Sequence, residues 1–270
     1  MNDAATATLK PRTSAANGQL WGARARDWAE LQESQFKPLY AAVFDRAGVK
    51  AGTRYLDVGC GSGLAVQTAA ALGAKVSAID AAEGLLAIAR ERTPAADIRQ
   101  GDLEEFPFGD SEFDLVTGFN SFQYAGNPAV ALHEAARVTK PAGRIVIVTW
   151  GEPEGMPAVA VITALKPLMP PPPPGAPGPF ALSDEKALRQ FAGNAGLTPL
   201  EVFDVDCPFS FPDEATAVRG WNASGVAVRA SQVASEAAVG EAHAKAIAPF
   251  RRPDGSYHIG ASFRCLLARP

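Results

Sequence analysis

The sequence predicts an α/β fold, in which a mostly parallel sheet is covered by helices on both faces. From residue 53 onward, short apolar runs of strand length alternate with segments of helical spacing. A glycine-rich turn at 59–63 joins the first run to the first helical segment. The run 145–148 has four consecutive β-branched residues, which is typical of a strand buried on both faces. This order predicts parallel strands joined by right-handed crossovers.

Length and composition restrict the class of protein. A chain of 270 residues fits one large domain, or a core with an appendage. The 25 basic and 29 acidic residues give a net charge of −4, so we expect no nucleic-acid partner. No apolar run approaches the ~20 residues of a membrane span, and the N-terminus has no apolar stretch typical of a signal peptide. We therefore expect a cytoplasmic protein.

Metal binding is not predicted. The three cysteines, Cys60, Cys207 and Cys265, form no closely spaced pair. Such spacing gives neither a structural zinc site nor a disulfide framework.

The N-terminal fifth of the chain precedes the alternating pattern. Residues 1–17 are small and polar and are interpreted as a flexible tail. Residues 18–50, rich in Trp, Leu, Phe and Tyr, are predicted to form a helical cap that ends near Gly48. Trp21 and Trp28 in this cap could cover a pocket, although core packing of an amphipathic helix explains them equally simply.

Residues 51–150 are predicted to form the cofactor-binding core. Its strands are expected at 54–58, 75–80, 96–100, 113–117 and 144–150. Its helices are expected at 64–72, 83–92 and 127–139. Ligands of such sheets bind beyond the carboxyl ends of the strands.

The remainder of the chain departs from the alternating pattern. Residues 151–182 are rich in proline and form either a surface connector or a lid over the pocket. Residues 183–270 are predicted to complete the core, with a helical insertion at 212–252 and a single last strand at 256–268.

The glycine-rich turn is the strongest indication of a ligand. Small residues let the backbone approach a ligand closely, and the following helix presents free N–H groups. The glycines lie at 59, 61 and 63, whereas the dinucleotide-binding pattern requires its third glycine at the position of Leu64. A phosphate-binding loop is also a poor match, because no Gly-Lys-Ser/Thr follows.

Acidic residues follow the next two predicted strands. Asp80 ends the second strand and could accept hydrogen bonds from both hydroxyls of a ribose. Asp102 follows the third strand and could accept from an exocyclic amine, with Leu85 and Leu103 on either side of the ring. Asn120 follows the fourth strand, where it could contact the amino-acid end of a ligand. Each acid could instead be an ordinary turn residue.

Taken together, these segments resemble the class I S-adenosylmethionine-dependent methyltransferases, in particular the branch of quinone-biosynthesis and other small-molecule enzymes. The resemblance rests on LDVGCGSG (56–63), Asp80, GDLEEFPFGDSEFDLV (101–116) and ARVTKPAGRIVIVTW (136–150). It implies a Rossmann-like doubly wound seven-stranded sheet whose last strand runs antiparallel. The chain departs from the family in having Ala142-Gly143 where Gly-Gly is usual, and Ala82 where Ser is frequent.

The resemblance also implies a site for S-adenosyl-L-methionine and a small-molecule acceptor that receives the methyl group by in-line displacement. A mostly apolar pocket wall would suit a hydrophobic or aromatic acceptor. The cofactor-binding residues expected on this basis are Asp57, Gly59, Cys60, Gly61, Asp80, Ala81, Leu85, Asp102, Leu103 and Asn120.

The catalytic base, if the reaction needs one, is not identified by the sequence. Tyr124 and His133 are the candidates, and packing or surface roles explain both. Two other functions stay open: a cofactor-binding protein without turnover, and a nicotinamide-dependent oxidoreductase. Leu64 in place of glycine argues against the second.

Overall fold

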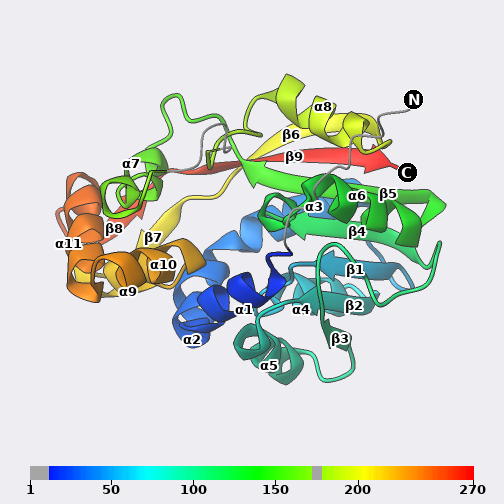
Figure 1. Ribbon diagram of the computed structural model, residues 1–270, viewed down its shortest axis with the longest axis horizontal. Coiled ribbons are helices and arrows are strands. Elements are labelled where there is room, and N and C mark those ends of the chain that lie inside the picture. The colour runs from blue at the N-terminus through cyan, green and yellow to red at the C-terminus, as the bar shows by residue number, and fades with distance from the viewer. Residues whose placement is uncertain (1–11, 172–177) are drawn as a thin grey trace, which may run out of the picture.

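The computed structural model describes residues 12–171 and 178–270. A seven-stranded sheet with the order β3-β2-β1-β4-β5-β9-β6 runs through the molecule (Figure 1). The strands are β1 (Arg54–Val58), β2 (Lys75–Asp80), β3 (Asp97–Gln100), β4 (Phe113–Phe119), β5 (Thr139–Trp150), β6 (Thr198–Asp206) and β9 (Ser262–Arg269). Strands β1 to β5 pair in parallel, whereas β9 is antiparallel to both of its neighbours. The predicted seven-stranded sheet with an antiparallel last strand is confirmed.

Helices cover both faces of the sheet. On one face α4 lies between α3 and α5, and on the other α6 packs against α8. Their bounds are α3 (Lys37–Ala47), α4 (Leu64–Ala71), α5 (Glu83–Arg92), α6 (Pro128–Val138) and α8 (Glu185–Asn194). Strand β5 supplies both cores: Val146 and Val148 join the cluster that includes α3, while Ile145 and Ile147 join the cluster that includes α6. Because residues 145–148 of β5 are buried on both faces of the sheet, they form a continuous apolar run in the sequence.

The segment expected to form a single last strand forms two. Tyr257–Ile259 (β8) pairs with Phe209–Phe211 (β7) in a small separate sheet, and β9 begins only at Ser262. At the break, the carbonyl of Ala261 accepts from the Cys207 amide. Tyr257, Ile259 and Ala261 are all buried, and β9 is then buried at six consecutive residues. The apolar residues of the sequence therefore do not reveal where the first strand ends.

The N-terminal cap consists of several short helical segments. Helix α1 (Ser14–Gly22) begins inside the segment interpreted as a flexible tail, and residues 1–11 lie outside the described residues. Helix α2 (Ala25–Asp27), a π-helical turn (Trp28–Gln32) and a 3-10 turn (Glu33–Phe36) lead into α3. Helix α1 packs against α5, where Gly22 and Gly84 allow close approach, and also against α10 (Gly225–Val233).

The insertion before the last strand is helical, as expected from its sequence. It contains α9 (Glu214–Asn222), α10 (Gly225–Val233) and α11 (Glu236–Ile247), gathered on the left in Figure 1. Asp213, Ser224 and Ser235 cap these helices by accepting a hydrogen bond from a backbone amide in the first turn.

The proline-rich segment is described only in part, because residues 172–177 lie outside the described residues. Its described part contains α7 (Ala158–Ile162) and a 3-10 turn (Lys166–Leu168). Across 12–171 and 178–270, no helix combines the length and apolar character needed to cross a bilayer.

Candidate functional site

The loop between β1 and α4 requires its glycines. Gly59, Gly61 and Gly63 have φ angles of +74°, +56° and +80°, a region that side chains disfavour. A Cβ atom on Gly59 would lie 2.5 Å from the Cβ of Ser121, which follows β4. The amides of Gly59 and Cys60 both donate to the carbonyl of Ile79 in β2. The loop therefore lies closely against the ends of the neighbouring strands.

Asp80 is bonded to this loop from the end of β2. One carboxylate oxygen accepts from the Gly61 amide and the other from the Ala82 amide, both at 2.8 Å. Burial raises the pKa of Asp80, although these amide hydrogen bonds favour its ionised form. An ionised carboxylate can accept about four hydrogen bonds, so Asp80 can also accept from ligand hydroxyls.

A pocket lies at the carboxyl ends of β1, β2, β3 and β4. It brings together most of the residues predicted from the sequence: Gly59, Gly61, Asp80, Ala81, Leu85, Asp102, Leu103, Asn120 and Tyr124. Trp28 and Phe119 complete its apolar wall. Its position agrees with the rule that such sheets bind ligands beyond the carboxyl ends of their strands.

Asp57 and Cys60 lie below the pocket rather than on its wall. Both are buried, and Asp57 Oδ1 accepts from Thr117 Oγ1 at 2.8 Å. The pKa of Asp57 is raised to about 7, chiefly by burial; the Thr117 hydrogen bond opposes this rise, and the nearby Glu33 carboxylate contributes to it. Asp57 thus connects β1 to β4 beneath the loop.

Asn120 and Tyr124 form the pocket wall that follows β4. Asn120 adopts a left-handed conformation with φ +54°, and its amide donates to the Val148 carbonyl at 3.0 Å. Tyr124 ends the short 3-10 helix Phe122–Tyr124. Burial raises the pKa of Tyr124 to about 12, so its phenol stays protonated at neutral pH.

The sequence did not predict that helix α1 and the residue before it contribute to the site. Ser14 Oγ donates to Asp102 Oδ2 at 2.7 Å, and Thr13 and Asn17 both donate to the Tyr124 carbonyl. Gly18 permits this arrangement, since a Cβ there would lie 2.5 Å from the Ala81 carbonyl oxygen. The small polar residues of this segment do not predict such contacts. Gly18 is the one residue of its sequence that is compatible with a close approach to another part of the chain.

Trp21 and Trp28 both line the pocket, with their rings edge to face at 4.9 Å between centroids. Trp221, which belongs to α9, is not among the residues that line the pocket and is part of the buried hydrophobic core.

The histidines lie elsewhere. His133 is exposed on α6 and is not among the residues that line the pocket. His243 is buried, where its Nδ1 pairs with Asn222 Oδ1 at 2.6 Å, and burial lowers its pKa to about 4. The described residues contain no cluster of three or more side chains suited to holding a metal ion.

Residues 56–147 match the family described as a methyltransferase domain. The chain thus contains a methyltransferase domain at these residues. The glycine loop, Asp80 and most of the residues that line the pocket belong to this domain, whereas helix α1 and Trp28 precede it.

Two named methyltransferases are similar to this chain over a longer stretch than residues 56–147. The demethylmenaquinone methyltransferase of Renibacterium salmoninarum is 33% identical over 155 residues, which is 57% of this chain and 61% of that protein. The ubiquinone biosynthesis O-methyltransferase of Pseudomonas aeruginosa is 35% identical over 133 residues, or 44% of this chain and 56% of that protein. The chain thus spans less than two thirds of the length of these relatives.

Among solved structures, a protein from Bacillus halodurans C-125 shares the fold with a TM-score of 0.57. It is 20% identical, and the match covers 85% of this chain and 97% of that one. The fold similarity thus covers a larger part of the chain than residues 56–147.

Proposed function

We propose that this protein transfers a methyl group from S-adenosylmethionine to a small-molecule acceptor. The observation that supports this most directly is the bonding of Asp80 to the Gly61 amide at the pocket wall, within a methyltransferase domain. The carboxylate then has lone pairs directed at the pocket, where a ribose would present its hydroxyls.

The residues present fit this cofactor. Asp102 supplies an acceptor for the adenine amine, and Leu85 and Leu103 supply apolar surface for the ring. The indole Nε1 of Trp28 is buried without a partner among the described residues, and it is a donor available near Gly61. Two carboxylates in the pocket disfavour a pyrophosphate or a 2′-phosphate, whereas a sulfonium compound carries no phosphate.

S-adenosylmethionine supplies a methyl group attached to a positively charged sulfur. The protein's task is to hold the acceptor in line with the carbon–sulfur bond, and positioning of this kind can supply about 7–11 kcal/mol. Helix α1 and the Trp21 and Trp28 rings cover the pocket and exclude water from it.

We infer that the acceptor is hydrophobic or aromatic. Much of the pocket wall away from the two carboxylates is apolar, with Phe119 and Ala125 among its residues. The relatives named for demethylmenaquinone and ubiquinone biosynthesis are consistent with an acceptor of this kind. The 212–252 insertion is proposed as a further wall on the acceptor side, whereas either a surface connector or a lid stays open for the proline-rich segment 151–182.

The acceptor atom is proposed to be nucleophilic without help from a protein base. Tyr124 stays protonated at neutral pH, and His133 lies outside the pocket. An amine, a thiolate or an already ionised acceptor satisfies this requirement, whereas a neutral hydroxyl does not.

Calorimetry tests the proposal with S-adenosylmethionine, S-adenosylhomocysteine and NAD as separate titrants. We expect the two adenosyl compounds to bind and NAD not to bind. Incubation with methyl-labelled cofactor and a panel of aromatic amines and aromatic thiols then tests transfer, with hydroquinones and catechols as the neutral-hydroxyl comparison. Binding without any labelled product would favour the cofactor-binding protein without turnover, and binding of NAD alone would favour the oxidoreductase.

A further inference from the structure

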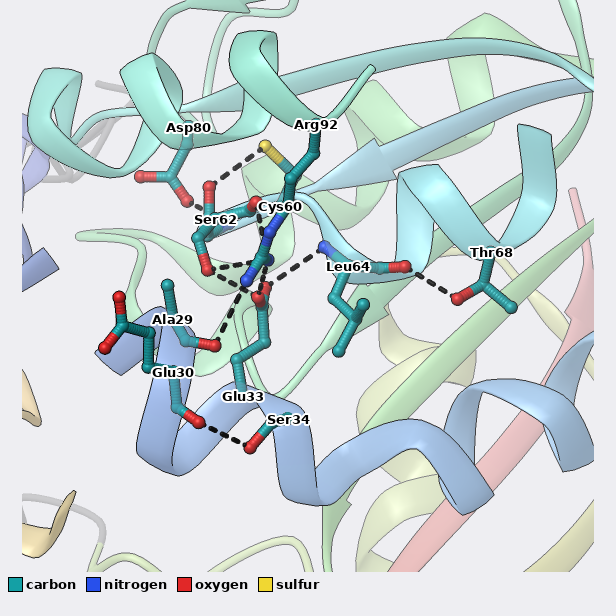
Figure 2. Close-up of polar contacts among 11 residues, drawn as sticks. Ala29, Glu30, Glu33, Ser34, Cys60, Ser62, Leu64, Thr68, Asp80 and Arg92 are labelled. Atoms are coloured by element: carbon teal, nitrogen blue, oxygen red, sulfur yellow. Dashed lines mark hydrogen bonds and ion pairs between the residues drawn. The ribbon is translucent and has the colours of Figure 1, made fainter. Parts of the chain in front are cut away.

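A buried ion pair joins the N-terminal cap to the glycine loop. Glu33 is only 3% exposed. Its Oε2 accepts from Ser62 Oγ and from Arg92 Nη1, and its Oε1 accepts from the Leu64 amide at 3.3 Å (Figure 2). A single carboxylate therefore contacts the loop, the first residue of α4 and the last residue of α5.

Arg92 strengthens this connection from the end of α5. Its Nη1 donates to the Ser62 carbonyl at 2.9 Å and to Ser62 Oγ at 3.1 Å. Its Nη2 donates to the carbonyl of Ala29 in the cap, also at 3.1 Å. The guanidinium thus bonds to both the cap and the loop, as Figure 2 shows.

The π-helical turn explains how the cap delivers this carboxylate. The Glu33 amide donates to the Trp28 carbonyl, five residues earlier. Five residues span about 1.4 turns of an α-helix, which would place the two side chains on different faces. The wider turn instead places both side chains against Gly61, where an added Cβ would lie 3.4 Å from Trp28 Nε1 and from Glu33 Oε1. Such turns occur frequently at functional sites.

Stability alone does not account for a charged pair at this place. Removing two charges from water is costly, and apolar residues of similar volume often give equal stability. The loop, however, contains three glycines in left-handed conformations, so it loses much conformational freedom when it is ordered. A clamp that orders the loop before the ligand arrives would increase affinity by lowering this entropic cost.

We propose that Glu33, paired with Arg92, is a positioning residue that holds the glycine loop in its cofactor-binding conformation. The carboxylate fixes Ser62 and the first turn of α4, and the Gly61 amide is thereby held toward Asp80. An anion at the N-terminus of α4 also interacts favourably with that helix. This inference rests on the proposed function, because the loop is the part of the site that would contact the cofactor.

The test compares Glu33→Gln with a matched control. Arg26 and Glu91 form a second ion pair between the cap and α5, at 3.1 Å, but both side chains are more than half exposed and neither contacts the loop. We expect Glu33→Gln to weaken binding of S-adenosylhomocysteine tenfold to a hundredfold, or about 1.4–2.8 kcal/mol, by calorimetry. Glu91→Gln should change the affinity less than twofold.

Amide hydrogen exchange separates positioning from general stability. In the ligand-free protein, Glu33→Gln should speed exchange of residues 59–64 more than that of the β4–β5 core, and saturating S-adenosylhomocysteine should restore slow exchange. A lower melting temperature with unchanged affinity and unchanged loop exchange would overturn the proposal.

A second variant covers the case in which Glu33→Gln does not fold. Arg92→Lys keeps the charge but loses the forked contacts to Ser62 and Ala29, so it should weaken binding by a smaller factor; an affinity equal to that of the unmodified protein would contradict the clamp. If the unmodified protein bound no adenosyl compound, the proposed function would fail as well. Unchanged loop exchange beside intact binding would refute only the role of Glu33.

Discussion

Replacing Asp57 by Asn should change how the stability of the protein depends on pH. Asp57 is 2% exposed, and burial raises its pKa from 3.8 to about 7. Asparagine has nearly the same shape, and its side-chain oxygen can still accept the hydrogen bond from Thr117 Oγ1. The substitution therefore removes the titration and retains the contact.

The sign follows from proton binding in the two states. Below about pH 4 the carboxyl is protonated in both states, so it makes no difference there. Between about pH 4 and 7 the unfolded chain ionises while the folded protein keeps its proton, so the free energy of unfolding falls as the pH rises. A difference of about three between the folded and unfolded pKa values corresponds to up to about 4 kcal/mol, all of it lost above pH 7.

Urea unfolding at half-unit steps from pH 4.5 to 8.5 measures this effect. The stability of Asp57→Asn relative to the unmodified protein should increase up to about pH 7 and then level off. Asp114→Asn serves as a control of opposite sign, because hydrogen bonds from Lys140 and the Arg54 amide outweigh burial and lower the pKa of Asp114. Its loss of stability should stay constant from pH 4.5 to 8.5, because the advantage of the ionised carboxylate is lost only below about pH 4. Parallel profiles for Asp57→Asn and the unmodified protein would refute the reasoning.

Three further predictions concern the site. Asp80→Asn should weaken S-adenosylhomocysteine binding tenfold or more in calorimetry, because an amide cannot accept from both the Gly61 and Ala82 amides and also from a ribose; an unchanged affinity would exclude Asp80 from the site. Tyr124→Phe should leave the pH profile of kcat unaltered between pH 6 and 9, since the phenol remains protonated, and a lost ionisation would show that it acts as a base. Gly59→Ala should lower the free energy of unfolding more than Gly61→Ala, because only the first Cβ would approach another atom within 2.5 Å; equal losses in urea unfolding would contradict this.

The sheet and the strand-end residues could be predicted because their signals are local. The apolar run 145–148 lies at the centre of β5, and the glycine spacing at 59, 61 and 63 is short enough to be recognised directly. Asp80 and Asp102 follow strands at the expected edge of the sheet, and the structure places both at the pocket. Each of these features can be recognised without knowing which distant residues it contacts.

The contributions of the cap could not be predicted, because they depend on partners far along the chain. Ser14 meets Asp102 across 88 residues, and Glu33 meets Arg92 across 59. The first lies in a segment whose composition resembles a tail, and the second depends on a π-helical turn that shifts the helical periodicity. Such contacts arise only when the fold brings the cap onto the loop.

The place of β9 in the sheet affects how the chain can fold during synthesis. Strands β5 and β6 emerge from the ribosome before the strand that separates them, since Ser262–Arg269 follows both in sequence. Until then each has a vacant hydrogen-bonding side, and vacant strand edges promote aggregation. The nascent chain should therefore depend on chaperones or on prompt synthesis of β9, even though residues 56–147 are translated early.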